Sequence, residues 1–268
     1  MKKVSLNHYL SISNPWTRRI IGIESFSKKR DIEQIEREYN QDKYGKLVEF
    51  DFDNIEIYKK KEFEFSGIDR DSPITISFDE ELFQTNIKFA RSLQSSIVSN
   101  TIERYNPNRI CELGCGYGYN LSYLQKEFPE VYGGEYSINA VELGTKLGFD
   151  LKRFNYYDLD DYNIIREGSL ILTSHSIEQI PSAKNFISGV EKHRQKIDVV
   201  VHFEPCLLET RSSLLGCFRN QYIKLNDYNT DLVKILHERD DIEILEYQPD
   251  FMGINPLNST HLIVWKFK

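Results

Sequence analysis

The chain has 268 residues and a formal net charge of −7 at pH 7, a size that suits one α/β domain plus an appended region. The acidic balance argues against a dedicated nucleic-acid binder, and no apolar run approaches the roughly 20 residues that span a bilayer. Four cysteines make no disulfide framework in a chain this long, and the basic start lacks the apolar run of a signal peptide, so we expect a cytoplasmic protein.

The N-terminal part is expected to begin with a basic arm. Residues 1–30 carry seven Lys or Arg and one Glu, a charge that suits either an anionic partner or an ordinary solvated terminus. Asp31, followed three residues later by Gln34, is typical of a helix N-cap, and this helix is expected to end before Gly45. We expect residues 1–105 as a whole to form a substrate lid of short strands and helices.

Two alternating segments follow this first helix. Residues 47–66 and 73–78 are rich in Phe, Val and Ile that alternate with polar residues, which predicts short strands or extended arms. Asp79 is expected to open a longer amphipathic helix that ends near Pro107. Aromatic residues make up 13% of the chain, and we expect part of this excess to wall a binding pocket and exclude water from it.

From Arg109 the pattern changes to short apolar runs that alternate with amphipathic segments, which indicates a parallel sheet with helices on both faces. The expected strands are 109–113, 130–135, 150–155, 169–174 and 197–203. The expected helices lie near 118–128, 137–147, 182–195, 208–222 and 228–238. The apolar segments Ile242–Tyr247 and His261–Phe267 predict an antiparallel closing hairpin, so residues 106–268 are expected to form one domain.

The first of these strands runs into a glycine-rich turn, Glu112-Leu113-Gly114-Cys115-Gly116-Tyr117-Gly118. A strand, such a turn and a helix let a ligand approach the backbone closely at the carboxyl edge of the sheet. A dinucleotide fingerprint places its third glycine where Tyr119 stands here, so Tyr119 counts against NAD. The acidic side chain of Glu112 favours a ligand that carries an ammonium group.

This turn resembles the first motif of the class I S-adenosylmethionine (SAM)-dependent methyltransferases, and the resemblance covers about residues 80–268. It implies a Rossmann-like, doubly wound, mostly parallel seven-stranded sheet with an antiparallel C-terminal hairpin. It also implies SAM as cofactor, S-adenosylhomocysteine (SAH) as product, Glu135 on the ribose hydroxyls and Asp158 on the adenine amino group. The implied cofactor-binding set is Glu112, Gly114, Cys115, Gly116, Gly118, Glu135, Tyr136, Tyr157, Asp158 and Ser174.

The next strand ends carry the candidate catalytic residues. The fourth strand runs into His175-Ser176-Ile177-Glu178-Gln179-Ile180-Pro181, which resembles a stretch of many small-molecule methyltransferases and departs from the Asn/Asp-Pro-Pro-Tyr motif of amine and amide methylation. The fifth strand ends in His202-Phe203-Glu204, where the His and the Glu share one face. The implied sheet order brings these strand ends near the transferable methyl, so the catalytic candidates are His175, Glu178, His202 and Glu204.

Three roles stay open for these four residues. A His oriented by a Glu is a suitable general base for an acceptor hydroxyl that loses its proton as it attacks the methyl group. Two His and two Glu are also a donor set for a divalent metal, although their spacing fits no fixed ligand pattern. The third role is structural, with hydrogen bonds that brace the loops at the strand ends.

The acceptor is expected to be a small molecule. The loop Asp250–Thr260 is rich in polar side chains, of which Asn255 and Asn258 are candidates to bind the acceptor. The arrangement is similar to small bacterial methyltransferases that tailor surface glycans. This similarity implies O-methylation of a sugar, phosphate or phosphoramidate group for capsule or surface polysaccharide. Two other functions stay open: a catalytically silent subunit that binds a partner protein, and an N- or C-methyltransferase of a nucleobase or RNA.

Overall fold

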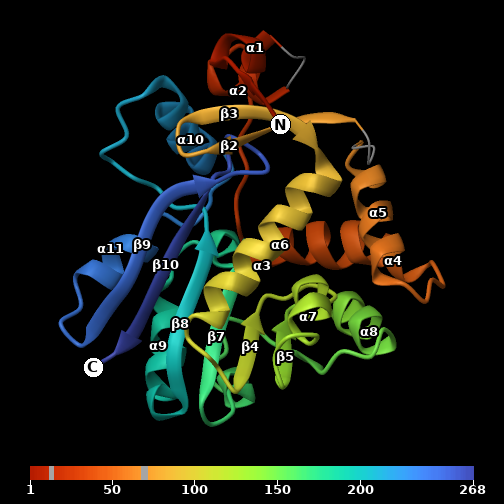
Figure 1. The fold of residues 1–268 in the computed structure, drawn as a ribbon, viewed down its shortest axis with the longest axis vertical. Helices are drawn as coiled ribbons and strands as arrows, with labels where there is room; N and C mark the ends of the chain where they lie inside the picture. Colours follow the sequence, from red (N-terminus) through yellow and green to blue (C-terminus); the bar gives the residue numbers. More distant parts are fainter. Residues whose placement is uncertain (12–14, 68–71) are drawn as a thin grey trace.

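A computed structural model describes residues 1–11, 15–67 and 72–268 of the chain. Within these residues, a seven-stranded sheet has the strand order β6-β5-β4-β7-β8-β10-β9 (Figure 1). Its strands are β4 (Arg109–Leu113), β5 (Glu130–Glu135), β6 (Leu151–Arg153), β7 (Ser169–Ser174), β8 (Ile197–Glu204), β9 (Ile242–Met252) and β10 (Thr260–Phe267). β10 pairs antiparallel with β8 and β9, whereas the other neighbours are parallel. The Rossmann-like, mostly parallel sheet with an antiparallel closing hairpin is therefore confirmed.

Helices cover both faces of this sheet. They are α6 (Ile87–Glu103), α7 (Tyr119–Leu124), α8 (Ile138–Lys146), α9 (Lys184–Lys192) and α11 (Leu232–His237). A further helix, α10 (Leu214–Leu225), packs on the N-terminal region, in an apolar cluster with Tyr9 and Leu82. Successive side chains of a strand point to opposite faces, so Ile110 of β4 joins the apolar cluster that contains Ile102 of α6. Its neighbour Cys111 joins the cluster that contains Phe186 of α9. In the described ranges, no helix is long and apolar enough to cross a membrane.

The N-terminal region adds a small antiparallel sheet and a set of short helices. The sheet has the order β1-β3-β2, with β1 (Lys2–Val4), β2 (Pro73–Phe78) and β3 (Glu81–Asn86). The helices are α1 (Leu6–Ser11), α2 (Pro15–Ile20), α3 (Ile32–Ile35), the π-helical η1 (Glu36–Tyr44), α4 (Gly45–Val48) and α5 (Ile55–Phe65). The expected cap is confirmed, because the Asp31 carboxylate accepts a hydrogen bond from the Gln34 N–H at 2.9 Å. Figure 1 shows α3 to α5 lying above the strand ends of the large sheet.

The expectation of short strands or extended arms is wrong over most of residues 47–66. All of these residues are described, and α5 is a helix from Ile55 to Phe65. Asn54 caps it by accepting a hydrogen bond from the Glu56 N–H at 2.8 Å. Aromatic and charged residues alternate in part of this segment, but the buried Tyr58 follows Ile55 at helical spacing and fixes the helix through packing.

The predicted start of the long helix at Asp79 is also wrong. Asp79 has a φ of 49° and lies in the turn between β2 and β3. The helix α6 begins after Asn86, whose side chain accepts a hydrogen bond from the Phe89 N–H at 2.8 Å. Asp and Asn both tolerate left-handed turn conformations and both cap helices, so the sequence signal at Asp79 fitted either structure.

Candidate active site

A cavity of about 420 Å³ opens at the carboxyl ends of β4, β5 and β7. Its walls come from both parts of the chain, because side chains of α3, η1, α5 and α6 face the glycine-rich turn. The aromatic residues that line it are Tyr39, Tyr44, Phe63, Tyr117, Tyr119, Tyr136, Phe154, Tyr156 and Tyr157. The expectation that part of the aromatic excess walls a pocket is therefore confirmed.

The structure brings most of the candidate residues together around this cavity. Those that line it are Glu112, Gly114, Cys115, Gly116, Glu135, Tyr136, Tyr157, Ser174, His175, Glu178, Asn255 and Asn258. Four others lie outside the lining, namely Gly118, Asp158, His202 and Glu204. Gly118 is the N-cap of α7 and has a φ of 87°.

Gly114 lies where two strand-end loops touch. It has a φ of 76°, in the left-handed region that favours glycine. A Cβ added there would lie 2.3 Å from the Cβ of Ser176, in the loop after β7. The glycine therefore lets the turn after β4 and the loop after β7 meet without a gap at the floor of the cavity.

Two buried carboxylates stand at the ends of β4 and β5. Glu112 accepts a hydrogen bond from the Asn120 side chain at 2.6 Å, and its Oε2 has no hydrogen-bond partner within the described residues. Burial raises the pKa of Glu112 to about 8. Glu135 accepts hydrogen bonds from the N–H groups of Gly116 and Ser137, each at 2.9 Å, and burial raises its pKa too. Both groups lie at the edge of the cavity, where Glu135 accepts hydrogen bonds and Glu112 can lose a proton to a cationic ligand.

The structure corrects the assignment of Asp158. Its side chain is exposed, lies outside the cavity lining and accepts a hydrogen bond from the Asp160 N–H at 2.9 Å. Asn155 lines the cavity instead, three residues earlier, because the chain turns there with a hydrogen bond from the Asp158 N–H to the Asn155 carbonyl at 3.0 Å. The sequence signal for Asn155 was its place as the first polar residue after β6.

His175 and Glu178 form a pair on the cavity wall. The Nδ1 of His175 lies 3.4 Å from Oε2 of Glu178, and its Nε2 is hydrogen-bonded to the Thr260 hydroxyl at 2.8 Å. Burial lowers the pKa of His175, but the Glu178 carboxylate outweighs it, so the pKa is raised above its ordinary value. The Asn258 amide donates to Glu178 at 3.1 Å and lies 3.4 Å from the His175 Nδ1. The backbone of His175 has a φ of 51°, uncommon for a side chain other than glycine.

Glu204 acts below the cavity wall, where it holds the loop that carries His175. Its carboxylate accepts hydrogen bonds from the N–H groups of Ser176, Ile177 and Glu178, at 3.0 to 3.3 Å. Burial and the nearby Glu178 raise the pKa of Glu204 to about 7. Glu204 lies outside the cavity lining and braces the loop, which is the structural role among the three left open for it.

The structure also corrects the assignment of His202. Its ring is fully buried between β8 and α9, where Nδ1 is hydrogen-bonded to the Thr173 hydroxyl at 2.7 Å and Nε2 accepts from the Trp265 indole at 2.9 Å. His202 and Glu204 do point to the same face of β8, because side chains alternate along a strand. At His202, however, this face packs against Phe186 of α9 in the core, below the edge of the sheet. The alternative metal set of His175, Glu178, His202 and Glu204 therefore does not converge. Across the described ranges, no group of three or more His, Cys, Asp or Glu is arranged to hold a metal ion.

The N-terminal wall is fastened on two sides. Asn40 of η1 accepts hydrogen bonds from the Ser137 hydroxyl at 2.7 Å and the Asn139 N–H at 3.1 Å, beside Glu135. Arg30 is buried and donates to the Asn226 carbonyl at 3.1 Å and to Glu38 at 3.0 Å. Arg30, a basic residue of the N-terminal arm, therefore makes contacts within the chain. These long-range contacts left no local signal in the sequence.

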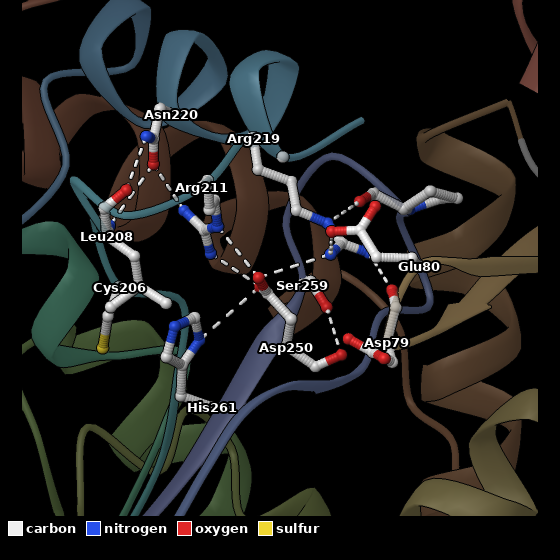
Figure 2. Close-up of polar contacts among 12 residues, drawn as sticks. Asp79, Glu80, Cys206, Leu208, Arg211, Arg219, Asn220, Asp250, Ser259 and His261 are labelled. Atoms are coloured by element: carbon white, nitrogen blue, oxygen red, sulfur yellow. Dashed lines mark hydrogen bonds and ion pairs between the residues drawn. The ribbon is translucent and has the colours of Figure 1, made fainter. Parts of the chain in front are cut away.

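A buried ionic cluster holds the loop that carries Asn255 and Asn258 (Figure 2). Asp250 accepts two hydrogen bonds from Arg211, at 2.8 and 2.6 Å, and lies 3.3 Å from the guanidinium of Arg219. Arg219 also donates to the Pro256 carbonyl at 3.0 Å and to the Asp79 carbonyl. The cluster ties α10, the β2–β3 turn and the loop together, so it positions the loop against His175.

The comparisons with known proteins bear on the fold. No protein-family profile matches the sequence, and no curated protein shows significant similarity to it. A SAM-dependent methyltransferase from Anabaena variabilis has a similar structure, with a TM-score of 0.52 and 16% identity over 91% of this chain and 99% of that chain.

Two other solved structures are more distant. The methyltransferase domain of bacterial CtHen1-C has a TM-score of 0.45 and 16% identity over 65% of this chain and 96% of that chain. The plantazolicin methyltransferase BpumL, solved with SAH and a triazolic desmethylPZN analog, has a TM-score of 0.42 and 17% identity over 68% of this chain and 86% of that chain. The similarity to the Anabaena protein establishes the fold alone: the chain has the Rossmann-like fold of class I SAM-dependent methyltransferases.

Proposed function

We propose that the protein is a SAM-dependent methyltransferase that acts on an oxygen of a small molecule. The observation that carries this proposal is the cavity at the strand ends. At one strand tip stands a Glu112 oxygen that has no hydrogen-bond partner among the described residues, and at the next stands Glu135. A buried carboxylate oxygen without a partner is costly unless a ligand completes it. The similarity of fold to a SAM-dependent methyltransferase supports the same assignment.

The residues present fit the donor. Glu112 would hold the ammonium group, Glu135 the ribose hydroxyls, and Asn155 with Tyr157 the adenine. A dinucleotide fits less well, because the glycine-rich turn itself carries no cation and Tyr119 replaces the third glycine. When bound, SAM supplies a methyl group on a positively charged sulfur that an oxygen nucleophile can attack.

His175 and Glu178 are the residues that we assign to the acceptor oxygen. A neutral His175 takes the proton that an attacking hydroxyl loses, and Glu178 stabilises the imidazolium that forms. The aromatic wall excludes water, which strengthens these interactions and suppresses hydrolysis. Residues 1–105 serve as the lid of this site, and Asn255 and Asn258 as contacts to the acceptor. The preferred acceptor is the sugar- or phosphate-linked small molecule indicated by the sequence, and a cavity of about 420 Å³ suits such a size.

Calorimetric titration with SAH and with NAD tests the donor assignment. We expect binding of SAH at one site per chain and no binding of NAD. Glu135→Ala is expected to weaken SAH binding by about 1.5–3 kcal/mol, the scale of hydrogen bonds to a charged group. Glu142→Ala, an exposed change of equal charge on α8, serves as the matched control and should bind SAH normally. Tight NAD binding, or no SAH binding by a folded protein, would contradict the proposal.

The pH dependence of methyl transfer tests His175. An acceptor is first identified by transfer of labelled methyl groups from SAM to a panel of sugars and sugar phosphates. Because a general base must be neutral and the pKa of His175 is raised, kcat/KM should fall as pH decreases, with a midpoint above the ordinary value of 6.5. His175→Ala should lower kcat about 10²–10⁴-fold and remove this titration. Near-normal rates in the variant would show that catalysis rests on positioning alone.

A further inference from the structure

Positive charge gathers at the end of the cavity formed by η1, α5 and α6. This cationic end consists of Lys43, Lys59, Glu62 and Arg91, all of which line the cavity. Glu62 is shared by two ammonium groups, at 2.8 Å from Lys43 Nζ and 2.7 Å from Lys59 Nζ. Within the described ranges Arg91 makes no ion pair; it donates to the neutral Gln94 at 2.9 Å, and its Nε is buried without a hydrogen-bond partner. Three basic side chains thus share one carboxylate at this end of the cavity.

Lys59 and Arg91 are held beside the same two aromatic rings. The Nζ of Lys59 lies 4.9 Å from the ring centre of Tyr119 and 5.3 Å from that of Phe63. The guanidinium carbon of Arg91 lies 5.0 Å and 5.7 Å from the same two centres. Cation–π contacts fix both groups at one place in the wall, but they do not neutralise the charge.

The electrostatics of Lys59 agree with a missing anion. Burial lowers the pKa of Lys59 to about 7, and the neighbouring Arg91 acts in the same direction, although Glu62 opposes both. A buried cation that is only partly balanced gains from an additional negative group. An arginine fork beside a lysine is also the donor arrangement that suits carboxylate and phosphate oxygens.

We propose that Lys59 and Arg91 bind an anionic group, a carboxylate or a phosphate, of a molecule that occupies the cavity. Two molecules of the proposed reaction can bring such a group, and this part of the inference rests on the proposed function. One is the acceptor, which then carries a phosphate or carboxylate near its reacting hydroxyl. The other is the donor, whose amino-acid end carries a carboxylate next to the ammonium assigned to Glu112.

The experiment compares Lys59→Met and Arg91→Met with matched controls. Lys60→Met lies on the same helix as Lys59, and Lys88→Met on the same helix as Arg91; both control side chains lie outside the cavity lining. Calorimetry measures the binding of SAH, of 5′-methylthioadenosine, which lacks the amino-acid end, and of pyrophosphate with and without saturating SAH. Thermal unfolding checks each variant, and Lys59→Met should remain folded because it removes a partly unbalanced buried charge.

The titrations with SAH and with pyrophosphate together distinguish whether the donor or the acceptor supplies the anionic group. If the donor supplies it, both cavity variants weaken SAH about tenfold or more and leave 5′-methylthioadenosine unchanged. If the acceptor supplies it, SAH binding is unchanged, and the SAH-saturated wild-type protein binds pyrophosphate about tenfold or more tightly than either variant. The controls behave as the wild type in both cases.

A result in which folded Lys59→Met and Arg91→Met bind all probes like the wild type would overturn the anion site. Failure of the proposed function is recognised separately. In that case the wild type binds neither SAH nor 5′-methylthioadenosine, and only the titration with pyrophosphate in the absence of SAH tests the anion site. Loss of pyrophosphate binding in both variants supports the site. Unchanged binding in the variants, or no binding by the wild type, refutes it.

Discussion

Binding of the donor should release a proton from Glu112. The Glu112 carboxyl is buried, and one of its oxygens accepts a hydrogen bond from the Asn120 side chain. Burial together with the nearby Glu135 and Glu204 raises the pKa of Glu112 to about 8. At pH 7 such a group is mostly protonated in the free protein. The ammonium group of the ligand favours the carboxylate form, so binding drives the proton off. We therefore expect Glu112 to contribute most of one proton to the release per SAH bound at pH 7, measured as the difference between the wild type and Glu112→Gln.

The proton count is measured by calorimetry of SAH binding in buffers that differ in ionisation enthalpy. Measurements between pH 6 and 7 keep the ligand amino group charged, since an α-amino group has a pKa of about 7.7–8.0. In this window the affinity should rise with pH, by up to about tenfold per unit. Glu112→Gln should bind SAH more weakly and release most of one proton fewer than the wild type, whereas Glu142→Gln on the exposed face of α8 should behave as the wild type. Equal proton release by the wild type and by a folded Glu112→Gln would refute the assignment of Glu112 to the ammonium.

Two further predictions concern the floor of the cavity and the core below it. Gly114→Ala places a Cβ 2.3 Å from that of Ser176 and should abolish SAH binding and lower the melting temperature. Gly148→Ala, at a φ of 88° with nothing within 4 Å, should cost only about 1–2 kcal/mol of unfolding free energy and keep SAH affinity; equal effects of the two changes would contradict the packing account. His202→Phe leaves the Trp265 N–H unpaired, so the unfolding free energy should fall by about 1–3 kcal/mol in denaturant titration. Its SAH affinity should stay normal, and selective loss of methyl transfer at unchanged stability would restore His202 as a catalytic candidate.

Local signals in the sequence were enough for the large sheet. Apolar runs bounded by turns located β4, β5 and β7 at the residues where the structure has them, and the alternation with amphipathic segments predicted helices on both faces. The glycine-rich turn located the cavity, because backbone at positive φ beside a strand end is needed for close approach there. These features depend on neighbours within a few residues along the chain.

The remaining features depend on contacts between distant residues. His202 looks like a strand-end histidine until Trp265 and the helix above it place it in the core. Asp158 and Asn155 are both polar residues after one strand, and only the tight turn between them decides which side chain faces the cavity. The cationic end has no local motif, since Lys59 and Arg91 come from two helices that meet only in the folded chain.

The most direct test of the account is a crystal structure of the protein with SAH. We predict one SAH in the cavity, with its ribose hydroxyls within hydrogen-bond distance of Glu135 and its amino group within that distance of Glu112. The sulfur should lie on the side of His175. SAH bound outside the cavity, or bound in it with neither carboxylate in contact, would contradict the central claim that this chain holds a methyl donor at the ends of β4 and β5.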